Sequence, residues 1–312
     1  MLFYSHMEKI ALDTNPNSNL HFELYESATD SINGLVQISH GMAEHKGRYA
    51  EFINFLNTNG FHVAIHDHRG HGERILDNKI GFFDQYDGWN MVVRDLLDIH
   101  LETNKRFPNI PKILLGHSMG SWIGLSALQR KNFFDAAMLS GSSYPKSSET
   151  FLQKLFLQME RFRLGNNGYS HLLHKIIFGG FNGKFQNTKT PNDWLSQDVE
   201  RVEDYTKDPL CGFVVTNQLW SDVIAGIKSV FNQKNLSLIN TNIPILVFSG
   251  SHDPVGTMGK GTRKLHECLI NNGCLSELYL VDGARHETLN ETNRIKTYNY
   301  VLKFLTNHLK GA

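Results

Sequence analysis

The chain has 312 residues, of which 40% are hydrophobic, and its 31 lysine and arginine residues balance its 31 aspartate and glutamate residues. This balance argues against nucleic acid as a partner, and no apolar run approaches the roughly 18 residues of a membrane-spanning helix. The N-terminal residues do not resemble a secretory signal, and three cysteines are too few for a disulfide framework. We therefore expect a globular protein in the cytoplasm, and the sequence does not indicate its oligomeric state.

The first half of the chain alternates short apolar runs with amphipathic segments. Strands are predicted at residues 21–26, 35–39, 63–65, 113–115 and 136–139, and helices at residues 48–59 and 89–105. In the first of these helices, Tyr49, Phe52 and Leu56 fall on one face. This alternation predicts an α/β protein with a mainly parallel sheet covered by helices on both faces. In such sheets ligands bind beyond the carboxyl ends of the strands.

The pattern changes between residues 144 and 235, where helical spacing with glycine interruptions replaces the alternation. Three apolar stripes occur there, formed by Phe151, Leu155, Met159 and Phe162, by Leu172, Leu173, Ile176 and Ile177, and by Trp220, Ile224, Ile227 and Phe231. We interpret residues 144–235 as a helical cap inserted between two parts of a sheet domain, residues 1–143 and 236–312. The alternative is that these helices simply cover the sheet. Further strands are predicted at residues 245–249 and 278–281, and a last helix at residues 292–309.

The segment Gly116-His117-Ser118-Met119-Gly120 fits the G-x-S-x-G pattern of a nucleophile elbow. It lies between a predicted strand and a predicted helix, which is the context that this motif requires. A serine hydroxyl is a weak nucleophile and must be held on a sharp turn where a base can reach it. Glycine permits the tight turn, and the start of a helix directs free backbone N–H groups at developing negative charge. We therefore predict that Ser118 is a nucleophile.

A serine nucleophile needs a histidine base and an acid that orients the histidine. In this architecture the chain order is serine, acid, histidine. Asp253 and His286 each follow one of the two late strands, so both are expected at the same edge of the sheet as Ser118. His252 and Asp282 are the nearest alternatives. We expect His252 to pack beside its loop and Asp282 to close a turn.

The oxyanion of a tetrahedral intermediate needs preorganised donors. One is expected to be the backbone N–H of Met119, which follows the nucleophile. The other is expected to be the N–H of Met42, in the loop after the strand at residues 35–39, where the alternative is an ordinary strand-ending turn. Glu44 and Arg48 follow this loop four residues apart and are expected to pair at a helix start.

These motifs, with several others, resemble those of one protein family. The matching segments are His40–His45 with Arg48-Tyr49, Asp67–Gly72, Gly116–Gly120, Asp208–Gly212, His252–Gly256 and Gly283–Glu287. On these segments the chain resembles the monoacylglycerol lipase and lysophospholipase group of α/β-hydrolases, which is grouped with serine aminopeptidase-like hydrolases. The resemblance implies an eight-stranded sheet with a cap and hydrolysis of single-chain acyl esters.

The same resemblance implies the site residues. The catalytic serine, acid and histidine fall on Ser118, Asp253 and His286, and the oxyanion donors fall on Met42 and Met119. The chain departs from the family pattern at Ser121, where many members have a third glycine. This departure does not touch the residues that carry the chemistry.

The expected partner is a small-molecule acyl ester, either a monoacylglycerol or a lysophospholipid, and the cap is expected to make transient contact with a membrane surface. No cofactor or metal is expected. His66, His68 and His71 are spaced like the ligands of some zinc hydrolases, but Gly70 stands where that motif needs an acid. The alternative functions are an aminopeptidase or amidase, an acyltransferase, and a non-catalytic scaffold of the same fold.

Overall fold

The computed structural model describes residues 6–12, 19–132, 134–145 and 147–309. Eight strands form one sheet: β1 (His6–Ala11), β2 (His21–Glu26), β3 (Gly34–Ser39), β4 (Phe61–Ile65), β5 (Lys112–His117), β6 (Ala136–Ser140), β7 (Pro244–Gly250) and β8 (Leu275–Val281). Their order across the sheet is β1-β2-β4-β3-β5-β6-β7-β8. β2 is antiparallel to both of its neighbours, and all strands from β4 to β8 in this order are parallel. The predicted mainly parallel, eight-stranded α/β sheet is confirmed.

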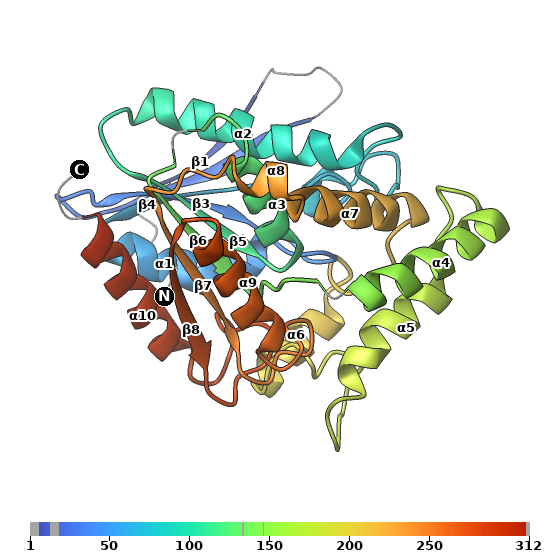
Figure 1. The fold of residues 1–312 in the computed structure, drawn as a ribbon. Helices are drawn as coiled ribbons and strands as arrows, with labels where there is room; N and C mark the ends of the chain where they lie inside the picture. Colours follow the sequence, from blue (N-terminus) through green and yellow to red (C-terminus); the bar gives the residue numbers. More distant parts are fainter. Residues whose placement is uncertain (1–5, 13–18, 133, 146, 310–312) are drawn as a thin grey trace.

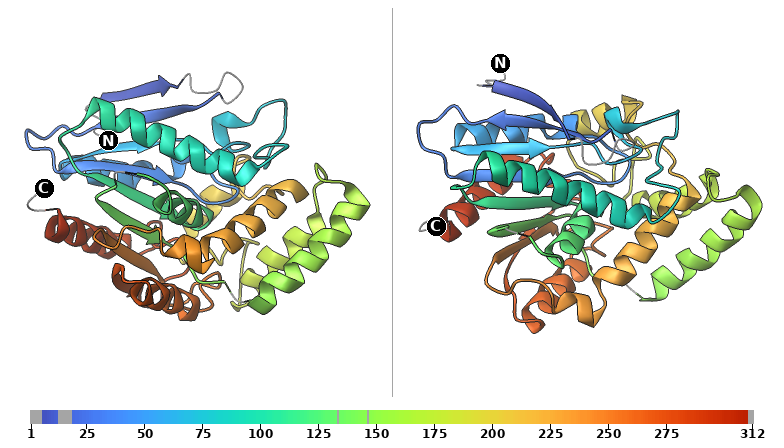
Figure 2. Two further views of the ribbon diagram at one scale, coloured as in Figure 1. Left: turned by 45° about the horizontal axis from the view of Figure 1, so that its top comes forward. Right: turned by 90° about the horizontal axis from the view of Figure 1, so that it is seen from above.

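The sheet is buried on both faces because consecutive residues of its central strands are apolar. In β5, Leu114 packs into one hydrophobic cluster, while its neighbours Ile113 and Leu115 pack into the other. Helices α1 (Ala50–Thr58) and α10 (Arg294–His308) contribute to the second cluster. The first cluster lies under helices α2 (Gly88–Arg106), α3 (Met119–Leu128), α7 (Asn217–Val230), α8 (Gln233–Leu236) and α9 (Lys260–Asn271). Figures 1 and 2 show these two helical layers on either side of the sheet.

The strand β1 is the one described strand that the sequence pattern did not predict. It lies at the edge of the sheet and, among the described residues, pairs only with β2. Ile10 is its only buried residue, so the strand lacks the apolar alternation by which a half-buried strand is recognised.

Residues 144–235 contain two structural parts. Helices α4 (Ser147–Leu164) and α5 (His171–Asn182) form a hairpin that lies beside the sheet (Figures 1 and 2). Helix α6 (Val199–Lys207) follows, and then α7, whose Trp220 and Ile227 are buried in the cluster shared with α2 and α3. The third apolar stripe therefore covers the sheet domain, as in the alternative interpretation of this segment.

The first two stripes are only partly buried. Leu173 and Ile177 of α5 pack into the large cluster, but the exposed apolar residues on the hairpin include Leu155, Met159, Phe162, Leu172 and Ile176. The side chain of Phe151 lies outside the described residues. No helix in the described part of the chain combines the length and apolar character needed to cross a membrane.

Candidate active site

Ser118 lies on a sharp turn between the end of β5 and the start of α3. Its backbone has φ 51° and ψ −118°, a conformation that residues with a Cβ atom rarely adopt, and its N–H donates a 2.9 Å hydrogen bond to the carbonyl of Ser140. A Cβ atom at position 120 would lie 2.1 Å from the carbonyl oxygen of Ser39, so only glycine fits there. The elbow motif is thus explained by the close approach of α3 to the end of β3.

His286 and Asp253 lie in the loops that follow β8 and β7. The Nδ1 atom of His286 is 3.0 Å from Oδ1 of Asp253. The other carboxylate oxygen of Asp253 accepts a 2.6 Å hydrogen bond from the hydroxyl of Ser249. Both side chains are buried, whereas the alternatives His252 and Asp282 are exposed. The structure therefore brings together the acid and the histidine that the sequence favoured.

The electrostatics of this pair favour a charged imidazole beside a charged carboxylate. Burial alone would raise the pKa of Asp253, but the adjacent imidazole and the hydrogen bonds to the carboxylate hold it below its ordinary value. Burial alone would lower the pKa of His286, but Asp253, and after it Glu287 and Glu44, raise it above its ordinary value. A buried histidine stabilised in this way is suited to receive a proton during a reaction.

Ser118 and His286 line one narrow pocket. The other lining residues are Gly41, Met42, Glu44, His117, Phe178, Trp194, Leu195, Tyr205 and Glu287. The cavity has a volume of about 30 Å³. Aromatic side chains restrict it, because the ring of Trp194 lies 5.1 Å from the ring of His286 and 5.8 Å from the ring of Phe178.

The backbone segments that carry Met42 and Met119 both lie beside the nucleophile. Met119 is the first residue of α3, where the backbone N–H groups have no partner within the helix. The loop that carries Met42 lies against the elbow, since a Cβ atom built on Gly41 would be 3.4 Å from the Cβ atom of Ser118. The structure thus places both backbone segments that the sequence proposed for the oxyanion beside the same serine.

A buried cluster of charges beneath this loop was only half predicted. The expected pair is present, with Nε of Arg48 3.6 Å from Oε2 of Glu44. Arg48 also donates a hydrogen bond to Glu287, and Glu44 accepts hydrogen bonds from the N–H of Gly41 and the hydroxyl of Tyr49. Burial, reinforced by the charge of Glu287, raises the pKa of Glu44 to about 7. Only the position of Glu287 next to His286 could have indicated its role, because its partner Arg48 is far away in the sequence.

The three histidines with metal-like spacing are buried in the core. His68 bonds through Nε2 to the carbonyl of His40 at 3.1 Å, and His71 bonds through Nδ1 to the carbonyl of Arg69 at 2.9 Å. Burial lowers the pKa of His66 and of His71 to about 4, so these imidazoles stay neutral. Within the described residues these side chains do not form a group whose ligand atoms converge.

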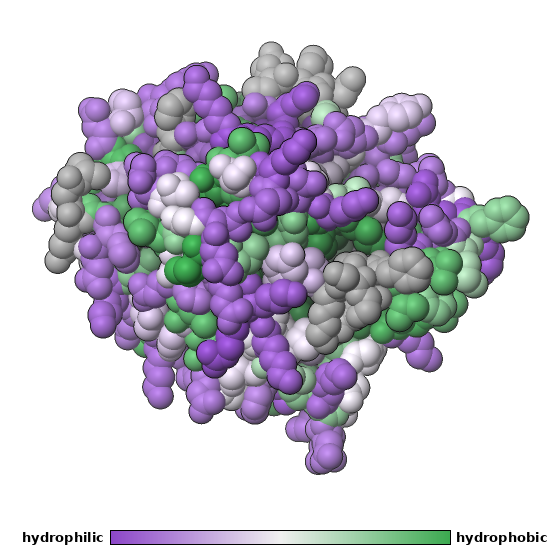
Figure 3. All heavy atoms as spheres, viewed as in Figure 1, coloured by the Kyte–Doolittle hydropathy of each residue, from purple (hydrophilic) through white to green (hydrophobic). Residues whose placement is uncertain are grey.

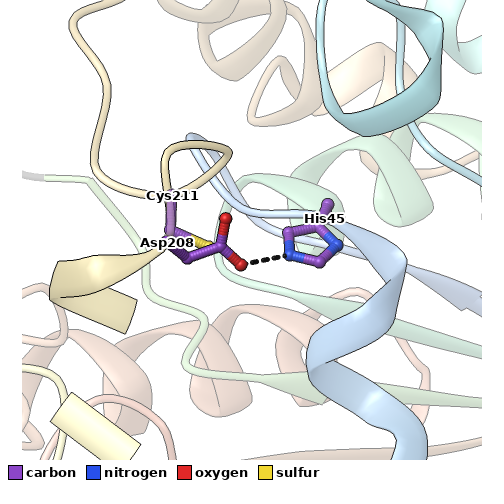
Figure 4. Close-up of side chains that lie close together, drawn as sticks. All are labelled: His45, Asp208 and Cys211. Carbon is purple, nitrogen blue, oxygen red and sulfur yellow. Dashed lines mark hydrogen bonds and ion pairs between the residues drawn. The ribbon is translucent and has the colours of Figure 1, made fainter. Parts of the chain in front are cut away.

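In the part of the chain that the structure describes, one group does have converging ligand atoms: His45, Asp208 and Cys211 (Figure 4). Nδ1 of His45 accepts a hydrogen bond from the N–H of Gly47, so Nε2 carries the proton and donates to Asp208 at 2.9 Å. Burial also raises the pKa of the Cys211 thiol, which disfavours the thiolate that binds metals. The positive charge of Arg48 acts on both Asp208 and Cys211. These residues therefore fit a hydrogen-bonded pair and do not fit a cation site.

The strand order, the elbow after β5 and the acid and histidine after β7 and β8 define an α/β-hydrolase. A family model described as serine aminopeptidase, S33, matches residues 30–293. The human monoglyceride lipase is 33% identical over 284 residues, which cover 87% of this chain and 81% of the human protein. The chain belongs to the serine aminopeptidase S33 family.

Solved structures show the same fold over nearly the whole chain. A thermostable carboxyl esterase from Bacillus coagulans, crystallised with glycerol, superimposes with a TM-score of 0.88 at 24% identity, covering 97% of this chain and 99% of the esterase. A lipase solved in an open form superimposes with a TM-score of 0.86 at 26% identity, covering 98% of this chain and 100% of the lipase. The helical segment between β6 and β7 is therefore included in the similarity.

Proposed function

We propose that this protein is a carboxylic ester hydrolase that cleaves monoacylglycerols through an acyl-enzyme on Ser118. The observation that carries the proposal is the single pocket shared by Ser118, on its strained elbow, and by the buried His286–Asp253 pair. The similarity to monoglyceride lipases supports the same class of substrate.

In this mechanism His286 acts as the general base. Its Nδ1 is bonded to Asp253, which leaves Nε2 to take the proton of the Ser118 hydroxyl as Oγ attacks the ester carbonyl. The N–H groups of Met42 and Met119 stabilise the oxyanion, and the imidazolium then protonates the leaving alcohol. Water, deprotonated by the same imidazole, attacks the acyl-enzyme and releases the fatty acid with Ser118 restored.

The composition of the pocket favours an uncharged headgroup. Two carboxylates, Glu44 and Glu287, face one guanidinium, Arg48, so the polar end of the pocket offers no excess positive charge to a phosphate. Phe178, Trp194 and Leu195 form its apolar side. This division suits an acyl chain joined to a neutral alcohol, which favours monoacylglycerol over lysophospholipid.

We propose further that the part of residues 144–235 that precedes α7 acts as the cap and that the α4–α5 hairpin contacts a lipid surface. Phe162 is 96% exposed and Met159 is 59% exposed. Figure 3 shows hydrophobic side chains gathered over this hairpin at the right of the view. Exposed apolar side chains gathered on one surface hairpin are typical of an interaction site. The three free cysteines support a reducing compartment such as the cytoplasm.

The decisive experiment combines covalent labelling with a substrate series. A fluorophosphonate should label the wild-type protein on Ser118, and Ser118→Ala should abolish labelling and reduce turnover by about 10⁴–10⁶-fold. Values of kcat/KM for monoacylglycerol should exceed those for lysophosphatidylcholine and for aminoacyl amides. Faster cleavage of amides would favour the aminopeptidase or amidase alternative, and transfer of the acyl group to added glycerol in preference to water would favour the acyltransferase.

A further inference from the structure

We propose that Tyr205, through the carbonyl of Ala43, is a positioning residue for the oxyanion-binding turn. The proposal rests on the function given above, in which the N–H of Met42 binds the oxyanion. We call residues Gly41–Ala43 the oxyanion turn. Ala43 is buried and has φ 54°, a left-handed conformation that is unfavourable for a residue with a Cβ atom. A strained residue beside the reacting groups persists only where its surroundings hold it.

Two donors from a distant segment hold this residue. The hydroxyl of Tyr205, in α6, donates a 2.9 Å hydrogen bond to the carbonyl oxygen of Ala43. The backbone N–H of Gly212 donates to the same oxygen, also at 2.9 Å. A carbonyl oxygen has two lone pairs, so both are used, and the peptide group that follows Ala43 is fixed in orientation.

The segment that supplies these donors is itself attached to the core at Asp208, which lies between them in the sequence, and at the ring of Tyr205. Asp208 accepts a hydrogen bond from His45 at 2.9 Å (Figure 4), and its other oxygen accepts one from the N–H of Leu210 at 2.8 Å. The guanidinium of Arg48 lies 4.8 Å from the centre of the Tyr205 ring. Tyr205 therefore links α6 to the helix start that follows the oxyanion turn.

The oxyanion turn is fixed from its other end as well. The N–H of Gly41 donates to the carboxylate of Glu44, so the residues on both sides of Met42 have their polar groups bound. A donor that is already oriented binds a developing oxyanion without reorganisation at the moment of reaction. The hydroxyl of Tyr205 thus acts on the reaction through the backbone, and its loss should affect the transition state more than the bound substrate.

The test is Tyr205→Phe, which removes the hydroxyl and keeps the ring. We expect kcat for p-nitrophenyl butyrate to fall by about 10–100-fold, below the 10²–10³-fold loss for a deleted oxyanion donor. KM should change by less than about twofold, because ground-state binding is retained. The inhibition constant of an alkylboronic acid, whose tetrahedral adduct resembles the intermediate, should rise by the same factor as kcat falls.

The matched control is Tyr169→Phe. Tyr169 also lies between β6 and β7 and donates its hydroxyl to a backbone carbonyl of the sheet domain, that of Ile80, at 3.1 Å. This variant should keep wild-type kcat and KM. An equal loss of kcat in both variants would show that any tether from this helical segment matters, and would overturn the special role of Tyr205.

A second pair of variants tests the same inference without touching the buried tyrosine. Asp208→Ala breaks the bond to His45 at a side chain that is 30% exposed, just after α6, whereas Asp204→Ala removes an exposed carboxylate from within α6. Only Asp208→Ala should lower kcat and weaken the binding of the boronic acid.

The proposal would also be contradicted by unchanged kcat in Tyr205→Phe, whether or not KM rises, or by equal behaviour of the two aspartate variants. The failure of the proposed function is distinguishable, since the wild-type protein would then show neither esterase activity nor labelling of Ser118.

Discussion

Oδ1 of Asp253 lies 3.0 Å from Nδ1 of His286, and neither side chain is more than 2% exposed. The serine hydroxyl of Ser249 and the N–H of Val255 bind the same carboxylate at 2.6 and 2.9 Å. The carboxylate therefore has a fixed orientation before it meets the imidazole. Because water does not reach the pair, its interaction is stronger than that of an exposed pair of the same geometry.

Asp253→Asn should leave the protein folded and lower kcat by about 10⁴-fold, because an amide cannot hold the imidazole in the tautomer that accepts a proton at Nε2. Asp282→Asn is the control, since Asp282 is close in sequence to His286 and exposed. Steady-state kinetics and circular dichroism of the two variants test this. Near-normal turnover of Asp253→Asn, or a loss confined to Asp282→Asn, would transfer the role to another acid.

The pH dependence should report the raised pKa of His286. The base is active only when neutral, so activity should be lost as the pH falls through its pKa. Burial would lower this pKa, but the charges of Asp253, Glu287 and Glu44 raise it. The acid limb of kcat/KM should therefore lie above the ordinary histidine value of about 6.5. The rate of fluorophosphonate labelling should follow the same curve, and a limb below the ordinary value would contradict the assignment.

Gly120→Ala should destabilise the fold by about 3 kcal/mol or more, as expected when a methyl group is forced into a packed site. Its Cβ atom would lie 2.1 Å from the carbonyl of Ser39 and 2.4 Å from that of His40. The control is Gly180→Ala in α5, where a Cβ atom meets nothing within 4 Å. Alanine there should raise helix stability by up to about 1 kcal/mol. Urea unfolding measures both changes, and similar values for the two variants would be inconsistent with the packing described.

Binding to lipid vesicles should depend on the exposed face of the hairpin. Replacing Leu155 and Phe162 together by serine should weaken partition onto phosphatidylcholine vesicles by about tenfold or more. The reason is that an apolar side chain gains favourable free energy when it leaves water, and serine does not supply this gain. Leu101→Ser on α2 is the control, because Leu101 is 47% exposed and Leu155 is 48% exposed. Sedimentation with vesicles gives the partition coefficients. Equal binding by all three proteins would exclude this face as the contact.

The parts of the site that the sequence predicted depend on local signals. The elbow is a contiguous motif in which close backbone contacts require glycine at positions 116 and 120, so Ser118 could be located from five residues. Asp253 and His286 could be chosen because each follows a strand and because carboxyl ends of parallel strands share one edge. Such inferences need only the order of elements along the chain.

The remaining features depend on contacts between distant residues. The sequence near Arg48 does not indicate that Glu287 binds this arginine. Likewise, the sequence near Ala43 does not indicate that the hydroxyl of Tyr205 binds its carbonyl oxygen. The apolar stripes gave the helices of residues 144–235 but not the exposure of their faces, because spacing shows which residues share a face and not what covers it. Strand β1 was missed because an edge strand with one buried residue leaves almost no pattern.

The small volume of the pocket has a consequence for binding. At about 30 Å³ it is narrow, and the rings of Phe178 and Trp194 restrict it, so we expect binding of an acyl chain to include separation of these rings. The apparent affinity is then the affinity of the open form multiplied by the fraction of molecules that are open. Each CH₂ of the chain adds about 0.8 kcal/mol to the former and nothing to the latter. Phe178→Leu, which loosens the ring packing, should raise kcat/KM for every ester by one common factor and leave the gain per CH₂ unchanged.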